Sequence, residues 1–453
     1  MWDPSWQDGT GSLPDQLAHE LRHRIARGSI SSGSLLPSER ALAAQAGVSR
    51  TTVGLAIDLL EAGGWCTRRA RSRAIVCLPD IHEQGLAPRP ASNAAFDPFS
   101  ALVAAPAALL EDAVERARSR LTPHLLGDGR LLGGLAELRA GIADRLTADG
   151  LATTREQVII TNGAMGALSA MLDATRGPVL VEDPTYHVAL RLLASRSRRV
   201  VAWGRGPSWD VDALHGVLRR EKPSVAYLIP DFHNPTGALA GNPERDALAG
   251  LERRVPLIVI DETLRELDLR DGDRNLDRPA MPRHLAELLP DAVTIGGFSK
   301  IVWSGLRIGW VRAPQRAQRE SLRRFTDVQP VPVFEQLIAT ELLPHLDEII
   351  ATRTGRLRVQ RDALLAGLRG HGLQVVTPPG GLVAWVDLGA PVADELVARL
   401  APHGVLAAPG REFGSAHRHA RFLRVPFTSD VGVLAQATER IARELEVVRR
   451  RKA

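Results

Sequence analysis

Between residues 158 and 313 the sequence repeats one pattern, in which a short apolar run is mostly followed by a longer stretch of helical character. The apolar runs are VIIT (158–161), PVLVED (178–183), VVAW (200–203), VAYLIP (225–230), LIVID (257–261), AVTIGGF (292–298) and RIGWVRA (307–313). Strands that are apolar along their whole length are typical of a mostly parallel sheet with helices on both faces. The sequence therefore predicts an α/β fold for this part of the chain.

The chain of 453 residues is too long for one ordinary domain. Residues 13–62 have a helical period, and WCTRRARSRAIVC after them contains two β-type runs around a basic turn. Beyond about residue 314, long helical segments are mixed with VAWVDL and RFLRVPF, which predicts a smaller α+β lobe. We predict one domain at 1–78 and a second at 97–453. Residues 79–96, rich in proline, alanine and polar residues, are predicted to be a linker.

Composition excludes several classes of protein. The first residues lack the basic start and apolar core of a signal peptide, and no apolar stretch reaches the roughly 18–20 residues that span a bilayer. Cys66 and Cys77 cannot form a disulfide scaffold, which fits a reducing cytosol; they either face each other across a hairpin or are small apolar fillers. We expect a cytoplasmic protein with neither a membrane nor a metal partner. The net charge of +5 favours a polyanionic partner.

The segment LPSERALAAQAGVSRTTV has the spacing of a helix-turn-helix. Ser38 stands where an N-cap would begin a helix, and Gly47 stands where that helix would end. Ser49 would cap a second helix that begins with RTTV after a turn of only a few residues. An arginine and two hydroxyl groups at a helix start suit phosphates and base edges, because the backbone N–H groups point the same way.

The turn after these helices carries Arg68, Arg69, Arg71 and Arg73 with no acid among them, as a wing that touches DNA would. The alternative is a solvated three-helix module with a basic loop. Residues 13–77 resemble the winged-helix DNA-binding domains of the GntR family, through LPSERALAAQAGVSRTTV, LLEAGGW and the hairpin after it. The DNA contacts that this resemblance implies are Arg40, Ser49, Arg50, Thr51, Thr52, Arg68, Arg69 and Arg71. Wings of the family usually contain glycine, whereas this turn reads RRARSR.

Lysine is rare in this chain, which contains only Lys222, Lys300 and Lys452. Lys300 follows an apolar run, where desolvation would lower the pKa of its amine and free it for Schiff-base chemistry. Arg307 offers a fork of donors to a phosphate near the same pocket. Pyridoxal 5'-phosphate (PLP) requires such a set: a lysine for the aldehyde, an acid for the ring nitrogen, donors for the phosphate and a flat cover for the ring. The alternative is a surface lysine.

The remaining groups follow in the expected order. TNGAMGAL would open a helix after the first apolar run, and its N-terminus at residues 163–165 could hold the phosphate. Tyr186 offers a ring to stack, Asn234 a donor to the 3'-hydroxyl, and Asp261 an acid that keeps the ring nitrogen protonated. Each of these has a structural alternative: Asn-Pro-Thr-Gly as a turn, the aspartate as a helix cap, and the tyrosine as a core ring.

Residues 97–450 resemble a fold type I aminotransferase, which implies the α/β PLP-dependent transferase fold with a small C-terminal lobe. By this resemblance Lys300 is the catalytic lysine that binds the aldehyde. The implied cofactor-binding residues are Gly163, Ala164, Met165, Tyr186, Asn234, Asp261, Thr263, Ser299, Lys300 and Arg307. RFLRVPF resembles the segment whose arginine holds an α-carboxylate, which implies that role for Arg424, while Arg421 is expected to face solvent.

Three positions depart from the pattern of that family. Thr263 stands where a tyrosine is common after the aspartate, and Gly297 stands where a serine is common before the lysine. Arg130 stands in place of a tyrosine that usually reaches the phosphate of the partner subunit. The missing hydroxyl groups argue against efficient catalysis more than against cofactor binding.

A winged helix that a proline-containing linker joins to an aminotransferase-like domain resembles the MocR subfamily of GntR regulators. The resemblance covers nearly the whole chain and implies a homodimeric transcriptional regulator that binds a double-stranded DNA operator. Its large domain would sense PLP, alone or as an external aldimine with a small amino compound. Two alternatives stay open: a working PLP-dependent aminotransferase with an accessory DNA-binding module, and a binding module that has lost its cofactor.

Overall fold

The computed structural model describes most of the chain. The described residues are 6–7, 11–26, 30, 34–62, 65–68, 73–76, 103, 105–204, 208–271, 279–405, 407–414 and 416–452. The chain divides into two compact units, Met1–Pro90 with Pro106–Ala108, and Ala91–Ala105 with Leu109–Ala453. The predicted linker at 79–96 lies outside the described residues, so the domain boundaries remain a prediction.

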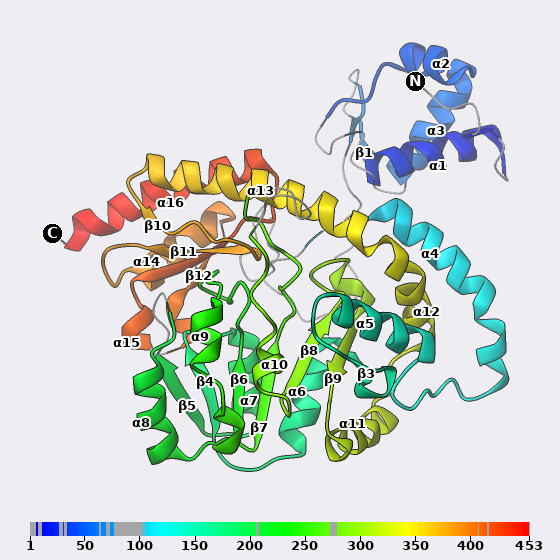
Figure 1. Cartoon of the computed structure of the whole chain (residues 1–453). Coiled ribbons are helices and arrows are strands. Elements are labelled where there is room, and N and C mark those ends of the chain that lie inside the picture. Colours follow the sequence, from blue (N-terminus) through cyan, green and yellow to red (C-terminus); the bar gives the residue numbers. More distant parts are fainter. Residues whose placement is uncertain are drawn as a thin grey trace. The chain divides into compact units, whose positions relative to one another are not determined.

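In its described residues, the smaller unit consists of three α-helices and a short hairpin (Figure 1). These elements are α1 (Leu13–Ala26), α2 (Glu39–Ala46), α3 (Arg50–Ala62), β1 (Cys66–Thr67) and β2 (Ile75–Val76). Leu17 and Leu21 of α1 pack with Leu42 of α2 and with Val53 and Leu60 of α3 in one apolar core. The spacing of these residues places them on one face of each helix, which is why the helices form around a shared core.

The predicted helix boundaries of this unit are confirmed. The Oγ of Ser38 accepts a hydrogen bond from the N–H of Ala41 at 3.2 Å, and α2 ends at Gly47 with a φ of 69°. The Oγ of Ser49 accepts from the N–H of Thr52 at 3.0 Å and so caps α3. These side-chain oxygens satisfy N–H groups that have no partner within the helix, which fixes where each helix begins.

The described part of the large unit contains a sheet of seven strands in the order β3-β9-β8-β7-β6-β4-β5 (Figure 1). The strands are β3 (Val158–Asn162), β4 (Val179–Asp183), β5 (Val200–Gly204), β6 (Val225–Leu228), β7 (Leu257–Asp261), β8 (Val293–Gly297) and β9 (Ile308–Arg312). Each coincides with one of the apolar runs, so the predicted sheet is confirmed. Because β9 is antiparallel to β3 and β8 and the other pairs are parallel, every strand except β9 ends at one shared edge.

Helices cover both faces of this sheet. Successive side chains of a strand point to opposite faces, so a strand that is apolar throughout presents apolar residues on both. Val179 and Val181 of β4 lie in one apolar cluster, and Leu180 between them lies in another. The first cluster includes residues of α6 (Gly163–Asp173), α7 (His187–Ser195) and α11 (Arg316–Val328). The second includes residues of α8 (Val211–Glu221) and α10 (Leu285–Leu288). This layering is that of the predicted α/β fold.

The predicted α+β lobe is also confirmed, as a described sheet of four antiparallel strands in the order β10-β11-β13-β12. These strands are β10 (Gln374–Val375), β11 (Val383–Asp387), β12 (Ala408–Pro409) and β13 (Phe422–Pro426). The helices α13 (Leu346–Gly370) and α16 (Val431–Lys452) lie side by side (Figure 1) and share an apolar core with this sheet.

Other helical elements complete the described structure. They are α4 (Ala107–Arg120), η2 (Thr122–Leu126), α5 (Ala136–Ala148), η3 (Arg155–Gln157), α9 (Asn242–Asp246), η4 (Leu251–Arg253), η5 (Ser304–Leu306), α12 (Val333–Leu342), η6 (Leu343–His345), α14 (Ala393–Leu400), η7 (Ala401–His403), η8 (Gly410–Phe413) and α15 (Ala416–His419). Among the described residues we find no helix with the length and apolar character that crossing a membrane requires.

Candidate functional site

The predicted residues of the large unit come together at the shared edge of its sheet. Tyr186 follows β4, Asn234 follows β6, Asp261 ends β7 and Lys300 follows β8. Since β9 runs in the opposite direction, Arg307 directly before it also lies at this edge. Open α/β sheets bind their ligands outside the carboxyl ends of the strands. The topology therefore gathers residues that are more than 100 positions apart in sequence.

Lys300 is half-buried at this edge. Burial lowers the pKa of its amine to about 8, and the guanidinium groups of Arg424 and Arg307 act in the same direction, while Asp261 opposes them. The sequence predicted a pKa shift in this direction. A neutral amine is the nucleophilic form of lysine, so this environment favours attack on an aldehyde.

Asp261 is a buried carboxylate with three hydrogen-bond donors. The hydroxyl of Tyr227 donates to its Oδ2 at 2.6 Å, and the N–H and Oγ1 of Thr263 donate to its Oδ1 at 3.0 and 2.7 Å. Burial raises the pKa of Asp261, although these donors oppose the rise. Thr263 thus orients the acid, and the carboxylate is held in one position without a cation in hydrogen-bond contact among the described residues.

The start of α6 forms a cradle next to Arg307. In the described structure, Asn162 before α6 makes no side-chain cap, so the N–H groups of residues 163–165 are available. A Cβ at Gly163 would lie 3.9 Å from a guanidinium nitrogen of Arg307, and a Cβ at Gly309 would lie 2.4 Å from the carbonyl carbon of Gly163. Glycine at 309 therefore lets β9 and α6 approach closely. Backbone N–H groups beside a guanidinium suit a phosphate.

Arg424 of β13 comes to the site from the small lobe. Only 2% of its surface is exposed, and its Nε donates to Oδ1 of Asn234 at 3.1 Å. Its Cζ also lies 5.5 Å from the ring centre of Phe413. Arg421, just before the strand that carries Arg424, is exposed and pairs with Asp387 at 2.6 Å, as expected for a residue facing solvent. A buried guanidinium near a reactive amine can hold a carboxylate.

Tyr186 and His187 begin α7 beside these groups. Burial raises the pKa of the Tyr186 phenol, with a further contribution from the charge of Asp261. Burial lowers the pKa of His187 to about 4, and the positive charges of Arg424, Arg191 and Lys300 act in the same direction. The imidazole is therefore neutral near pH 7. Its ring centre lies 5.2 Å from that of Tyr186, with the two planes nearly perpendicular.

The structure gives a physical reason for one departure from the family pattern. A Cβ at Gly297 would lie 3.0 Å from the carbonyl oxygen of Ile308 and 3.2 Å from Cα of Gly309. A serine would crowd the neighbouring strand β9, so this part of the chain requires glycine. Ser299, a predicted cofactor-binding residue, is half-buried, and its carbonyl accepts a hydrogen bond from the hydroxyl of Ser304 at 3.1 Å.

Sequence reasoning missed Tyr227, His187 and Phe413. Tyr227 lies in the middle of an apolar run and was included only as part of a buried strand. A signal was present, because the chain has only two tyrosines and a buried phenol usually requires a hydrogen-bond partner. For His187 and Phe413 we find no comparable signal, since their contact joins segments more than 200 positions apart.

In the smaller unit, the predicted DNA contacts on the two helices are accessible. Arg40 of α2 is exposed, as are Ser49, Arg50 and Thr51 at the start of α3, while Thr52 is half-buried. The hydroxyls of Ser49 and Thr52 lie 2.8 Å apart. The hydroxyls of Ser49 and Thr52 are thus engaged in capping α3, whereas Arg50 and Thr51 beside them are exposed.

Arg68 of the predicted wing is already paired within its own unit. Its Nε lies 2.8 Å from Oε2 of Glu61, its N–H donates to Oε1 of Glu61 at 2.8 Å, and its Nη2 contacts Asp58. These contacts tie the first strand of the hairpin to α3. Arg69 and Arg71 lie outside the described residues, so their predicted DNA contacts remain predictions.

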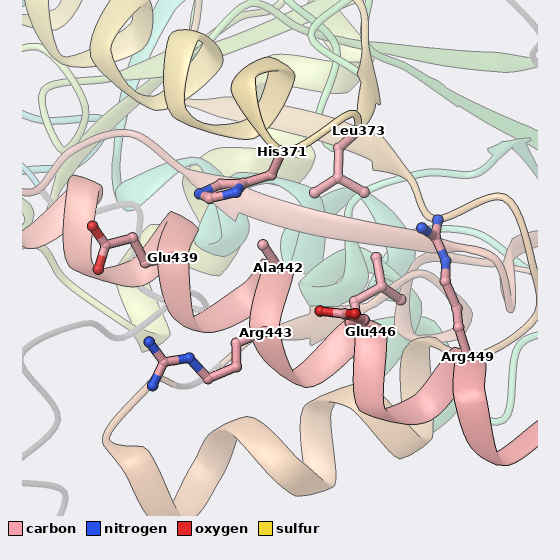
Figure 2. Close-up of a pocket in the computed structure, with 8 residues that line it drawn as sticks. His371, Leu373, Glu439, Ala442, Arg443, Glu446 and Arg449 are labelled. Atoms are coloured by element: carbon pink, nitrogen blue, oxygen red, sulfur yellow. The ribbon is translucent and has the colours of Figure 1, made fainter.

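A groove of about 620 Å³ lies in the small lobe, apart from these groups. Figure 2 shows His371 and Leu373 on one side and residues of α16 on the other, among them Arg443 and Arg449. None of the predicted cofactor residues lines this groove. Its lining mixes acids and bases, and we assign no ligand to it.

Two family models match the chain. The model described as aminotransferase class I and II matches residues 107–441, which is more than half of the chain. The model described as bacterial regulatory proteins, gntR family, matches residues 13–76. Both matches agree with the resemblances drawn from the sequence.

Similar proteins include an enzyme and a regulator. A 2-aminoadipate transaminase of Thermus thermophilus is 32% identical over 333 residues, covering 69% of this chain and 80% of that protein. The HTH-type transcriptional regulator TauR of Rhodobacter capsulatus is 28% identical, covering 96% of this chain and 97% of that protein. The crystal structure of LysN, an α-aminoadipate aminotransferase from Thermus thermophilus complexed with N-(5'-phosphopyridoxyl)-L-leucine, matches with a TM-score of 0.69 and 27% identity, covering 78% of this chain and 92% of that one. The chain therefore belongs to the aminotransferase class I and II family and has the MocR-type architecture, in which a GntR helix-turn-helix domain precedes that fold.

Proposed function

We propose that this chain is a cytoplasmic DNA-binding transcriptional regulator whose large unit binds PLP and senses PLP itself or an amino compound. The observation that carries the proposal is that Lys300, with its lowered pKa, meets Asp261, Arg307 and Arg424 in a chain that also contains a helix-turn-helix. A regulator that aligns over nearly the full length favours this function over an enzyme.

The residues present fit PLP group by group. The phosphate requires N–H donors, the ring a flat cover, the 3'-hydroxyl an amide, and the ring nitrogen an acid. In the same order, the chain offers the first turn of α6 with Arg307, then Tyr186, Asn234 and Asp261. A cationic ring nitrogen beside Asp261 would favour the ionised carboxylate and offset the cost of its burial.

PLP, when bound, supplies an aldehyde that reacts with amines. Lys300 would hold it covalently, because a pKa of about 8 leaves part of the amine neutral near physiological pH. Asp261 would keep a proton on the ring nitrogen, and Tyr227 and Thr263 would hold the acid in place. Arg424 would bind the carboxylate of an amino compound through its guanidinium.

A ligand changes DNA affinity only through its different affinity for two arrangements of the protein. We infer that two chains assemble, so that two helix-turn-helix units meet paired half-sites of the operator. Support for a subunit contact comes from exposed leucines close together in sequence. Leu125, Leu126 and Leu132 are 68%, 90% and 60% exposed, and apolar surface of this kind marks interaction sites.

The proposal is tested by measuring DNA affinity with the full chain. An operator is first selected from random double-stranded oligonucleotides, and its affinity is then measured with and without saturating PLP. We expect PLP to change the affinity by at least about five-fold in the wild type and in Lys452→Ala, but not in Lys300→Ala. Failure to select any DNA, or the same PLP response in Lys300→Ala, would refute the proposed function.

The DNA-binding half has its own test in Arg50→Ala. We expect this substitution to weaken operator binding by about 1–3 kcal/mol if Arg50 contacts a base. Arg316→Ala, in the large unit, removes an arginine that is 87% exposed and serves as the control. Equal binding by the two variants across a salt titration would show that Arg50 makes no specific contact.

A working aminotransferase is the second candidate. The 32% identity to a 2-aminoadipate transaminase and the presence of the lysine, aspartate and arginine at one edge favour it. Steady release of a keto acid from a panel of amino acids with 2-oxoglutarate would support catalysis. Binding of PLP without turnover would favour the regulator.

A further inference from the structure

Two segments that are far apart in sequence are fastened together beside Arg424. Nε2 of His419 lies 2.8 Å from Oδ1 of Asp183, although 236 positions separate the two residues. Asp183 is 3% exposed and His419 is 6% exposed. The N–H of Thr185 also donates to the carbonyl oxygen of Phe413 at 2.7 Å. We call these two contacts, Asp183–His419 and Thr185–Phe413, the clasp.

Glycine residues let the clasp close tightly. A Cβ at Gly414 would lie 2.0 Å from Oδ1 of Asp183, and a Cβ at Gly410 would lie 2.3 Å from the carbonyl oxygen of His419. A side chain at Gly414 would push the small lobe away from the end of β4, and a side chain at Gly410 would separate η8 from α15, which carries His419. The close approach of these segments therefore requires glycine at both positions.

The clasp joins the end of β4 in the large sheet to a segment of the small lobe. Asp183 is the last residue of β4, whereas Phe413 ends η8 and His419 ends α15. Nη1 of Arg418 lies 3.5 Å from Oδ2 of Asp183, and this positive charge favours the ionised carboxylate. A carboxylate accepts hydrogen bonds only, so we assign the proton of this contact to Nε2 of His419. Buried charge-assisted hydrogen bonds of this kind hold two segments in one register.

Phe413, which the clasp holds in place, contacts a site residue of the large sheet region, His187, and one of the small lobe, Arg424. It is fully buried, and its ring centre lies 5.1 Å from that of His187 and 5.5 Å from Cζ of Arg424. Trp385 packs on another side at 5.8 Å between ring centres. The guanidinium of Arg424 therefore contacts both an aromatic ring and the Asn234 amide, and these two contacts restrict its orientation.

We propose that Asp183 and His419 are positioning residues for the amino compound: through the clasp they hold Phe413 against Arg424 and so preorganise the guanidinium that binds the carboxylate. This inference rests on the proposed function. A side chain that is already oriented loses less freedom when a ligand binds, so preorganisation raises affinity. PLP itself has no such carboxylate, so the clasp acts on recognition of the amino compound and not on the ring site.

A matched pair of ligands isolates this effect. N-(5'-phosphopyridoxyl)-L-leucine carries the ring, the phosphate and a carboxylate, whereas pyridoxamine 5'-phosphate carries only the first two, and neither has an aldehyde that reacts with Lys300. We divide the dissociation constant of pyridoxamine phosphate by that of the leucine compound, both measured by calorimetry on the full chain. This ratio reports how much the leucine arm with its carboxylate adds to the affinity. We expect Asp183→Ala and His419→Ala, which each remove one partner of the Asp183–His419 contact, to reduce this ratio at least ten-fold, while the affinity for pyridoxamine phosphate stays within about three-fold.

His419→Gln is the conservative variant, because its amide N–H can still donate to Asp183. We expect it to keep most of the wild-type ratio. An unchanged ratio in Asp183→Ala and His419→Ala, or equal losses of affinity for both ligands, would overturn the inference while leaving the proposed function intact. A wild type that binds neither ligand would refute the proposed function and this inference with it.

Discussion

Asp261 and Glu262 are neighbours in the chain, yet their side chains enter two polar sites of opposite character. Asp261 meets hydroxyl groups and a backbone N–H, whereas Oε2 of Glu262 lies 2.8 Å from Nδ1 of His284. The pKa of Asp261 is raised by burial, and the pKa of Lys300 near it is lowered. Both shifts favour the neutral forms.

The site around Glu262 is an ionic network with balanced charge, and all of its members except Asp149 are buried. Its members are three acids and three bases: Asp149, Asp231, Glu262, Arg245, Arg265 and His284. Burial alone would lower the pKa of His284, but Glu262 and Asp149 raise it to about 9. Against the effect of burial, Arg245 and Arg265 lower the pKa of Asp231. These shifts favour the charged forms.

At one edge of the sheet, the network around Glu262 thus stabilises the fold, whereas the Lys300 site is built for binding a ligand. The network compensates each buried charge with a partner, so it holds α5, α10 and the ends of β6 and β7 together. In the Lys300 site, burial shifts the pKa values of the amine and of Asp261 toward the neutral forms, which costs stability but keeps groups ready to react with a ligand. Removing a charge from the network should therefore lower the free energy of unfolding, whereas removing the amine of Lys300 should raise it.

The largest effect is expected for Arg245→Met. Arg245 is fully buried, and its Nη2 lies 2.5 Å from Oδ1 of Asp231. Removing Arg245 leaves the buried carboxylate of Asp231 with an ion pair to Arg265 alone among the described residues, at 3.4 Å, so we expect a loss of about 3–5 kcal/mol in the free energy of unfolding. Urea denaturation followed by tryptophan fluorescence measures it. Arg316→Met, which removes an exposed pair with Glu320, should cost less than about 1 kcal/mol. Equal losses of stability in Arg245→Met and Arg316→Met would show that the network does not stabilise the fold more than a surface ion pair does.

The next effect is a dependence of stability on pH through His284. Its pKa in the folded chain, about 9, lies above its ordinary value of 6.5. Its stabilising contribution is therefore fully present below pH 6.5 and is lost as the pH rises through 9, by about 3 kcal/mol at most. Denaturation curves between pH 6 and 10 should show this loss in the wild type but not in His284→Gln. The same slope in both proteins would show that another group titrates.

Lys300→Met should stabilise the chain in the absence of PLP. The folded-state pKa of about 8 lies below the ordinary 10.5, so the charged amine is penalised at pH 7, and the penalty fades as the pH rises from 8 to 10.5. We expect a gain of about 1–3 kcal/mol at pH 7, with a smaller gain at pH 10. A loss of stability at pH 7 would contradict the proposed division between the two sites.

The smallest effect is expected for Tyr227→Phe. Asp261 would lose one hydrogen bond but keep both donors of Thr263, so we expect a cost of about 1 kcal/mol. The pKa of Asp261 should rise further, which would weaken its hold on a protonated ring nitrogen and lower the affinity for pyridoxamine phosphate several-fold. Calorimetry on Tyr227→Phe beside Tyr186→Phe, which leaves the Asp261 donors intact, would test this; an unchanged affinity would mean that Tyr227 has only a packing role.

Local signals in the sequence predicted much of the fold. The caps at Ser38, Gly47 and Ser49 depend on neighbours within three or four positions, and apolar runs specify strands without reference to distant residues. Lys300 was recognisable because lysine is rare in the chain and because it follows a buried strand. Arg68 shows the limit of such reasoning, since its acids lie on the preceding helix and not in the turn.

Contacts between distant segments could not be predicted in this way. The donor from Tyr227 to Asp261 depends on the register of two parallel strands, which pairs Tyr227 with Val259. The clasp between Asp183 and His419 depends on how the small lobe docks on the sheet. No pattern within either segment encodes such a meeting, so the contacts that support the site emerged only from the three-dimensional arrangement.

The central claim is that the amine of Lys300 binds the aldehyde of PLP, and the scarcity of lysine makes it directly testable. The full chain is incubated with PLP, treated with borohydride to fix any linkage, digested and analysed by mass spectrometry. We predict a phosphopyridoxyl label on the peptide that contains Lys300 and none on those that contain Lys222 or Lys452. A label on either of the other two lysines instead, or no label at all, would contradict the claim.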